Sequence, residues 1–154
     1  MTSRSLAIAA LVLWLVTLAV FGVFFVRGNT APGSDKRTAI LLGTGERELI
    51  LSEMRGLLTS THAILEGLND GDRAQIARAA SQAGMASAAD VNPALMSKLP
   101  LEFKSLGMSV HHDMDDLAAA ARSGKPAADI QKMLTSTLAK CVSCHSAWQL
   151  QAAD

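Results

Sequence analysis

The sequence PAADIQKMLTSTLAKCVSCH, residues 126–145, carries the clearest structural pattern in the chain. Its apolar and small residues recur at steps of three and four, which is the spacing of one face of an α-helix. Pro126 suits the start of such a helix, because the Ser-Gly-Lys before it breaks the preceding segment. We therefore expect a helix from Pro126 to about Leu150. Its inward face would be formed by Ile130, Met133, Leu134, Thr137, Leu138 and Cys141.

Three further segments upstream predict helices. They run from about Thr44, as a cap, to Leu68, then from Asp72 to Met85 and from Pro100 to Arg122. Turn residues separate them, and no segment alternates with the two-residue period of a strand. Four amphipathic helices with short connections predict an all-α, antiparallel four-helix bundle over residues 44–154. The expected inward residues are Leu51, Met54, Leu58, Thr61, Leu65 and Leu68 in the first segment, and Ile76, Ala79, Ala80 and Ala83 in the second.

An uncharged apolar run of 21 residues, Leu6 to Val26, lies near the N-terminus. As a helix it would be about 31 Å long, close to the thickness of the hydrocarbon core of a bilayer. A cleaved secretory signal is the alternative, but the run is longer than the usual ~7–15-residue signal core and no clear cleavage site follows it. We expect a retained N-terminal transmembrane helix at residues 1–27 and a Gly- and Pro-containing linker at residues 28–43.

The composition of the remaining chain narrows its class. The formal net charge is zero, and Lys and Arg are scattered singly, so no basic patch speaks for nucleic-acid binding. After the apolar run only two aromatic residues remain, Phe103 and Trp148. A core so poor in large side chains predicts either closely packed, alanine-rich helices or a bound group that is not an amino acid.

Both cysteines of the chain lie in Cys141-Val142-Ser143-Cys144-His145, the C-x-x-C-H pattern of c-type haem attachment. Two thiols three positions apart match the two vinyl groups of a porphyrin, and the next residue places an imidazole at the iron. The motif therefore predicts one covalently attached haem c. Cys141 and Cys144 would carry the thioether bonds, and His145 would be an axial ligand of the iron.

Three other uses of two such cysteines agree less well with the chain. A redox-active dithiol normally opens a helix after a strand, and no strand is expected here. A closed zinc site needs two further ligands, and His62, His111 and His112 lack the spacing of such a site. A disulfide within C-x-x-C on a helix would be strained.

The stretch MDDLAAAARSGKPAADIQKMLTSTLAKCVSCHSAW, residues 114–148, resembles the end of the third helix, the loop and the fourth helix of the cytochrome c-prime family. The resemblance covers roughly Glu46 to Gln149. It implies a four-helix bundle with the haem motif near the C-terminus and His145 as the proximal ligand. It also implies that Leu51 and Met54 line the distal face and that Arg47 lies near the haem propionates.

This chain departs from the family's pattern in two places. Gln149 stands four residues after the haem histidine, where members of the family usually have an arginine. The apolar N-terminal run is the second departure, because the familiar members are soluble. Without that positive charge, the family's usual electrostatics at the proximal histidine and its gas binding do not carry over directly to this chain.

Two kinds of residue compete for the sixth position on the iron. Met54 lies on the apolar face of the first helix, and its thioether sulfur is a good ligand for low-spin haem iron, although methionine at helical spacing often only packs a core. His111 or His112 is the alternative. We expect this histidine pair to lie on a solvated face, because acidic residues surround it.

These features predict a membrane-anchored electron carrier rather than an enzyme, held by lipid contacts of its N-terminal helix. Its partner would be a redox protein or a membrane complex, and anchoring raises its effective concentration beside such a partner. The alternatives are a five-coordinate haem module that binds NO or CO, and a haem-bearing accessory subunit of a membrane redox complex.

The expected location is the cytoplasmic membrane, with a single pass and the haem domain in the periplasm. Covalent haem attachment takes place outside the cytoplasm in bacteria. Arg27, Lys36 and Arg37 follow the span, and positive residues usually remain in the cytoplasm. We give this charge pattern less weight because long domains translocate largely regardless of charge.

Overall fold

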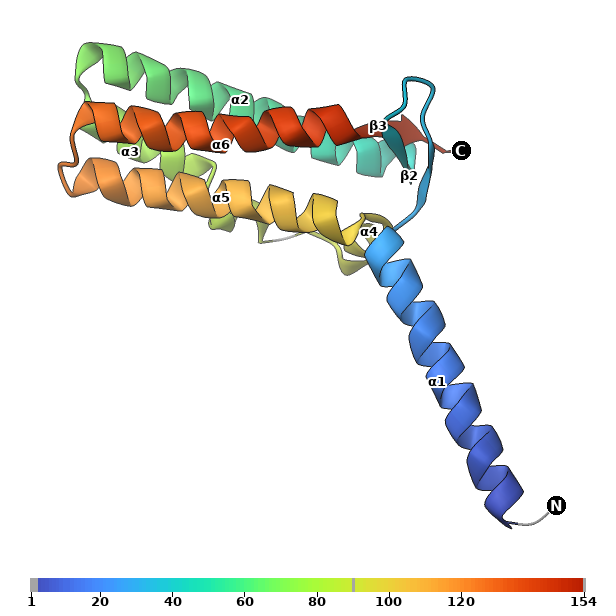
Figure 1. Cartoon of the computed structure of the whole chain (residues 1–154). Helices are drawn as coiled ribbons and strands as arrows, with labels where there is room; N and C mark the ends of the chain where they lie inside the picture. Colours follow the sequence, from blue (N-terminus) through green and yellow to red (C-terminus); the bar gives the residue numbers. More distant parts are fainter. Residues whose placement is uncertain (1–2, 90, 154) are drawn as a thin grey trace.

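The computed structural model describes residues 3–89 and 91–153. The chain is mostly helical, at 77%, with six α-helices and one small sheet among these residues (Figure 1). The helices are α1 (Ser3–Arg27), α2 (Thr44–Asp70), α3 (Arg73–Gln82), α4 (Pro93–Lys98), α5 (Leu101–Arg122) and α6 (Ala127–Ala147), with a short 3-10 turn, η1 (Met85–Ala88). The strands are β1 (Thr30–Pro32), β2 (Thr38–Leu42) and β3 (Trp148–Ala152). The predicted helical class is confirmed.

Helix α1 is apolar and projects from the rest of the molecule (Figure 1). Its span from Arg4 to Arg27 has 24 residues, and none of its most apolar part is buried against the protein. A core helix of a soluble domain would bury one face, whereas α1 exposes all of them. Its length and composition are those of a membrane anchor or of a signal sequence.

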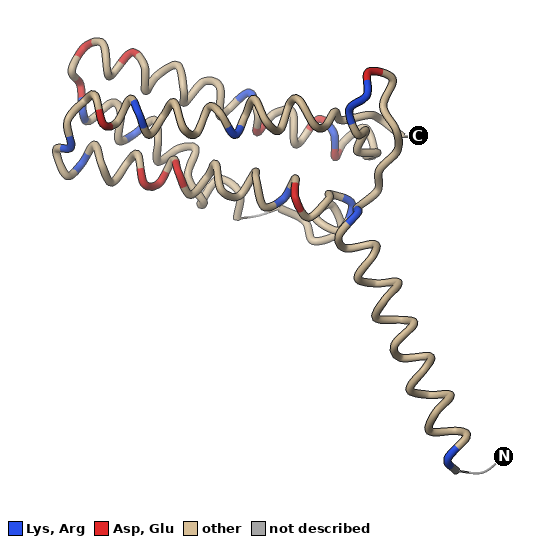
Figure 2. Tube along the Cα trace, in the orientation of Figure 1, with Lys and Arg blue, Asp and Glu red and all other residues tan. Residues whose placement is uncertain are grey.

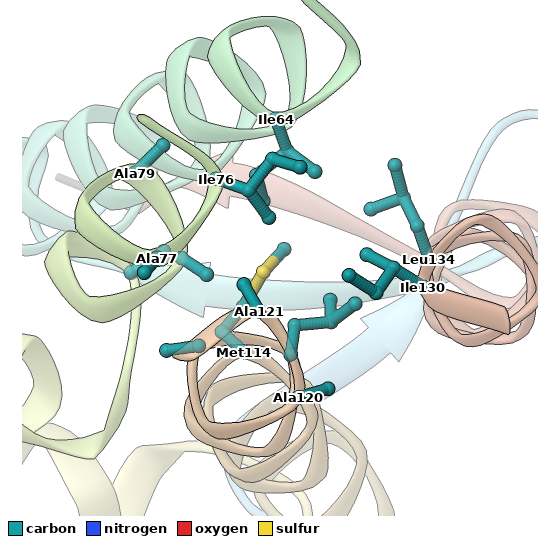
Figure 3. Close-up of a cluster of buried hydrophobic side chains, with 13 residues drawn as sticks. Ile64, Ile76, Ala77, Ala79, Met114, Ala120, Ala121, Ile130 and Leu134 are labelled. Carbon is teal, nitrogen blue, oxygen red and sulfur yellow. The ribbon is translucent and has the colours of Figure 1, made fainter. Parts of the chain in front are cut away.

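The main hydrophobic core lies between α2, α3, α5 and α6 (Figure 3). Alanines from α3 and α5 let these helices approach closely, and Met114 fills the space between them. Leu117, Ile130 and Leu134 are buried almost completely. The predicted inward residues of the second segment, Ile76, Ala79, Ala80 and Ala83, are all buried.

The predicted inward face of α2 is confirmed in part, because Thr61 is buried and Met54 and Leu68 pack against the two core clusters. Leu58 and Leu65 were expected inside, but they are 69% and 43% exposed. The residues that pack inward are their neighbours Leu57 and Ile64. A one-residue step rotates a helix by about 100°, so the sequence offers two apolar faces and tertiary packing selects between them.

The small sheet contradicts the expectation that the chain has no strands. β1 pairs with β2 antiparallel, and β2 pairs with β3 parallel, from Thr38 opposite Trp148 to Leu42 opposite Ala152. Part of the expected linker is therefore folded, and Ile40 is completely buried. The last helix also ends earlier than predicted, at Ala147, because the chain turns into β3 there.

The ends of the helices follow from local capping. Gly43 rather than Thr44 caps α2, and its backbone N–H donates to the carboxylate of Glu46 at 2.8 Å. At the other end Gly71 adopts a left-handed conformation, which glycine tolerates, and closes α2. Asp72 caps α3 by accepting a hydrogen bond from the backbone of Gln75 at 2.9 Å.

A second cluster of apolar residues joins the sheet to the helices. It contains Ile40 and Leu42 from β2, Ile50 from α2, and Phe103 from α5. Side chains of Met54, Cys144, Trp148 and Leu150 pack around this cluster. The sheet therefore fixes the N-terminal part of α2 and the C-terminal part of α6 at the same end of the molecule.

The joint between α1 and the rest of the chain is closely packed. The amide of Asn29 donates to the carbonyl of Lys98 at 2.7 Å. Gly28 has a φ of 63°, and a Cβ there would lie 2.5 Å from the same carbonyl oxygen. The buried Lys104 donates to the carbonyl oxygens of Phe25 and Met96, and its ammonium lies 3.9 Å from the centre of the Phe25 ring.

Candidate cofactor site

The C-x-x-C-H motif occupies the last turns of α6. Cys141 and Cys144 are both half-buried and both line one cavity. Val142 and Ser143 between them are exposed. Residues three apart on a helix share a face, so the two thiols point to the same side while the residues between them point away. His145 lies exposed at the edge of this cavity and lines it as well.

The cavity lies between α2, α5 and α6 and is mostly apolar. Its volume is about 120 Å³. A second cavity of about 260 Å³ adjoins it, and Met54, Phe103, Cys144 and His145 line both. Together the two volumes reach the ~300–1,000 Å³ range of ligand sites. The helices are thus packed tightly at the alanine-rich end and leave space at the end that carries the motif.

The structure brings the predicted site residues together. Met54 faces both cavities from α2, opposite the motif. Leu51 and Arg47, one and two turns earlier on the same helix, line the second cavity. Arg47 also donates to the carbonyl of Leu150 in β3 at 3.3 Å and pairs with Glu48 at 3.1 Å. The roles suggested for these side chains toward haem stay predictions.

His111 corrects the prediction that both histidines of the pair are solvated. It is only 7% exposed and lines the cavity with the thiols, whereas His112 is exposed. Its Nδ1 lies 2.8 Å from the carbonyl oxygen of Ala83. A carbonyl can only accept, so Nδ1 carries the hydrogen and Nε2 is the atom left free to meet another group. Its spacing from Met114 and Leu117, at steps of three, is a sequence signal that indicates burial.

Polar groups on two helices lie beside His111 in the cavity wall. Glu53 of α2 is half-buried; burial raises the pKa of its carboxyl, and the nearby His111 opposes that shift. Lys140 of α6 pairs with Asp113 of α5 at 2.7 Å, and Thr137 donates to the same carboxylate at 3.0 Å. The cavity wall therefore contains charged groups that the sequence prediction missed.

Aromatic packing closes the sheet side of the site. The rings of Phe103 and Trp148 meet edge to face, 5.8 Å apart and at 89°. The backbone amide of Trp148 donates to the carbonyl of Cys144, and α6 ends because Trp148 itself adopts an extended conformation. Both aromatic residues that follow the apolar run in the sequence therefore line this site.

A cation stands beside His145, although position 149 holds glutamine. Arg37, from the start of the sheet, donates to the carbonyl oxygens of His145 at 3.2 Å and Trp148 at 3.4 Å. Its charge is paired with Asp35 at 2.6 Å, and Gln149 contacts the same carboxylate. No local sequence pattern indicates this contact, because 108 positions separate Arg37 from His145.

The state of the thiols argues against a redox dithiol. Burial raises the pKa of both cysteines, and for Cys144 the neighbouring Cys141 raises it further. Thiols with raised pKa values stay protonated near neutral pH, whereas dithiol catalysis needs a thiolate. The two cysteines are free in the structure.

A zinc site is disfavoured by the positions of the other ligands. Among residues 3–89 and 91–153, no three His, Cys, Asp or Glu side chains gather as a metal site. A c-type haem site needs a different set of groups from a zinc site. These are two thiols on one face, an adjacent imidazole, apolar walls and basic groups at a rim. The site offers each of these, with Arg37 and Arg47 on the second cavity. The residues present therefore fit a covalently held haem.

Comparisons with protein-family models, with curated proteins and with solved structures find no match for this chain.

Proposed function

We propose that this chain is a membrane-anchored monohaem c-type cytochrome of the cytochrome c-prime type. In this proposal α2, α3, α5 and α6 form an antiparallel four-helix bundle, α1 is a retained transmembrane anchor, and the bundle lies in the periplasm. The function is one-electron transfer at that face of the membrane.

One observation carries the proposal. Both thiols of the motif and His145 border the same cavity, and Met54 enters that cavity from the facing helix. A chance C-x-x-C-H on a surface helix would need no cavity beside it. Bundles typically place cofactors between facing helices in this way.

The proposal assigns each of these side chains a role in holding the haem. Cys141 and Cys144 would hold the group through sulfur, and His145 would supply an imidazole to the iron. Met54 would offer its sulfur to the iron from the facing helix, and Leu51 would lie on the same side. Phe103 and Trp148 would exclude water from the sheet side, and Arg47, which lines the second cavity, would lie near the negative propionates.

Haem iron, when bound, exchanges one electron between its ferrous and ferric states. The protein's contribution is a fixed ligand pair and a largely apolar environment, both of which limit rearrangement on electron transfer. His145 lies at the surface, so one edge of the site is open to a redox protein or a membrane complex. The anchor keeps that edge near membrane-bound partners.

The alternatives differ in the sixth ligand or in the partner. A five-coordinate site, with Leu51 and not Met54 beside the iron, would bind NO or CO. A haem-bearing accessory subunit of a membrane redox complex would keep the same site and pack α1 against other membrane helices.

Absorption and EPR spectra of the purified holoprotein, with and without CO, test the proposal. We expect low-spin spectra in both oxidation states, no CO adduct, and haem that stays attached to the denatured chain. Met54→Ala should convert the iron to a high-spin, CO-binding form, because Met54 is the only methionine among the described residues that line the cavity. Met133→Ala, in the main core, is the control and should keep the low-spin spectrum.

Three results would contradict this assignment. High-spin iron that binds CO in the unchanged protein would favour the gas-binding alternative. A low-spin spectrum that survives Met54→Ala would remove Met54 as the ligand. Protein from its native membrane without sulfur-bound haem would overturn the cytochrome proposal altogether.

A further inference from the structure

A further cavity lies apart from the motif, at the end of α1. Its volume is about 580 Å³. It lies between the last residues of α1, Val26 and Arg27, the turn between β1 and β2, and the start of α5. Trp148 forms part of its inner wall. Nothing in the proposed electron-transfer role uses this space.

The position of the cavity relative to α1 fixes its depth in a membrane. Between Arg4 and Arg27 the helix carries no charge, and Figure 2 shows it without charged residues between its ends. The hydrocarbon region must therefore end near Val26, and Arg27 enters the layer of headgroups. With α1 as the proposed anchor, the cavity that Val26 and Arg27 line would lie at the level of the phospholipid phosphates.

The charge of the cavity favours an anion. Its lining contains three basic residues, Arg27, Lys36 and Arg37, and one acidic residue, Glu102. Arg37 is already paired with Asp35 at 2.6 Å. Within the described part of the chain, Arg27 and Lys36 form no ion pair with a carboxylate. Two cations beside one carboxylate leave a net positive site.

The walls of the cavity are held in place before any ligand arrives. Lys36 has a φ of 72°, a left-handed conformation that non-glycine residues rarely adopt. The turn around it is locked, because the amide of Gly33 donates to the carbonyl of Arg37 at 2.8 Å. A Cβ at position 33 would lie 2.3 Å from that oxygen. On the opposite wall, Lys104 fixes the end of α1 through the carbonyl of Phe25.

We propose that this cavity binds the phosphate headgroup of an anionic phospholipid from the membrane that α1 enters. Arg27 and Lys36 donate charge-assisted hydrogen bonds to the phosphate, and Glu102 limits how much negative charge the site accepts. A membrane lipid is the expected ligand because α1 places the site at the bilayer surface. The acyl chains of that lipid can continue along Val26. This inference rests on the proposed retention of α1, and it is independent of the haem ligands.

The test uses full-length holoprotein in bilayers of phosphatidylcholine containing a minor fraction of phosphatidylglycerol. After extraction in mild detergent, native mass spectrometry counts the phospholipids that remain bound. We expect one phosphatidylglycerol to be retained in preference to phosphatidylcholine. Arg27→Gln and Lys36→Gln should each reduce that preference about fivefold, and Glu102→Gln should increase it.

Lys132→Gln is the matched control. Lys132 is exposed near the start of α6, away from the sheet, and its loss removes the same charge. It should leave the retention of phosphatidylglycerol unchanged. Equal retention in the two cavity variants and in the unchanged protein, or equal retention of both lipids, would overturn the proposal.

Two further outcomes separate this proposal from others. If inorganic phosphate displaces the lipid at millimolar concentration, the site takes free phosphate and the lipid assignment is wrong. A mature chain that begins after residue 27 would overturn both the anchor and the lipid site. The haem spectrum of the same samples reports on the cytochrome separately, so covalent haem without lipid selectivity overturns only the lipid site.

Discussion

The imidazole of His111 shows what a single buried polar residue contributes. Its Nδ1–H bonds the Ala83 carbonyl at the end of α3, and it does so inside the protein, at 7% exposure. Replacing it with a side chain that cannot donate would leave that carbonyl without its partner. A buried group that loses its hydrogen bond costs about 1–3 kcal/mol.

We therefore predict that His111→Phe lowers the free energy of unfolding by about 1–3 kcal/mol. Denaturant unfolding of the holoprotein, followed by the helical circular dichroism signal, measures the change. His111→Gln should recover most of the loss, because its amide can donate to the same oxygen. His112→Phe, at an exposed position, should change stability by less than about 0.5 kcal/mol. Equal effects of the two phenylalanine variants would show that the bond to Ala83 contributes nothing.

The motif and its surroundings differ in how much a short stretch of sequence can predict. The roles of Cys141, Cys144 and His145 follow from a local pattern and stay predictions. The buried face of α2 could not be read in the same way, since Leu57 and Leu58 are adjacent and equally apolar, as are Ile64 and Leu65. Which member of each pair is buried depends on the helices that pack against it.

At the scale of elements, the start of α2 is joined to α4 by charge. Lys98 donates to both carboxylate oxygens of Glu46, at 2.7 and 2.8 Å, and the amide of Gly43 donates to one of them. These contacts hold the pKa of Glu46 below its usual 4.5, and the contact with Lys98 has the largest effect. The ionised form is therefore favoured by folding. Its contribution to stability is present above about pH 4.5 and is lost as the pH falls through the lowered pKa.

Glu46→Gln should lower the Tm at pH 7, and the difference from the unchanged protein should shrink as the pH falls below 4.5. Glutamine can still accept from Gly43 but cannot pair with the charge of Lys98. Thermal unfolding between pH 3 and 7 measures both effects. Glu66→Gln, which loses only an exposed contact with His62, is the control. A Tm difference that does not depend on pH would contradict the ion-pair explanation.

The helices were predictable as elements, and the sheet was not. Turn residues such as Gly71 and Pro100 mark the ends of helices in the sequence itself. β2 reads TAILL, with two buried residues side by side, so it lacks the alternation typical of a strand. Its partner β3 lies 110 positions along the chain, counting from Thr38 to Trp148. Pairing over that distance leaves no local signal.

At the scale of the whole molecule, Lys104 links the apolar helix to the rest of the chain. It is 8% exposed, and burial lowers the pKa of its ammonium. The favourable contacts with the Phe25 ring and with the carbonyls of Phe25 and Met96 offset that burial. The direction in which α1 leaves the domain is therefore set by packed contacts, and not by a flexible tether.

Lys104→Met should loosen this joint without unfolding the core. Hydrogen exchange at the amides of Gly28 and Asn29 should speed up roughly tenfold, since each lost hydrogen bond is worth about 1 kcal/mol or more. Exchange at Ile76 and Leu117 in the main core should not change. Lys132→Met is the control for the loss of a surface lysine. Unchanged exchange at Gly28 and Asn29 in Lys104→Met would show that the other contacts at the joint suffice.

The parallel pairing of β2 with β3 has a consequence for the order in which the protein matures. β3 follows its partner β2 by 110 positions, counting from Thr38 to Trp148, so it leaves the ribosome well after β2. The end of the molecule that carries both thiols thus stays open until β3 has been made, because closing so long a loop is slow compared with forming local helices. During that interval the two cysteines are more accessible for attachment of the proposed haem than they are in the folded chain. Pairing of β2 with β3 then fixes the end of α6 that carries them.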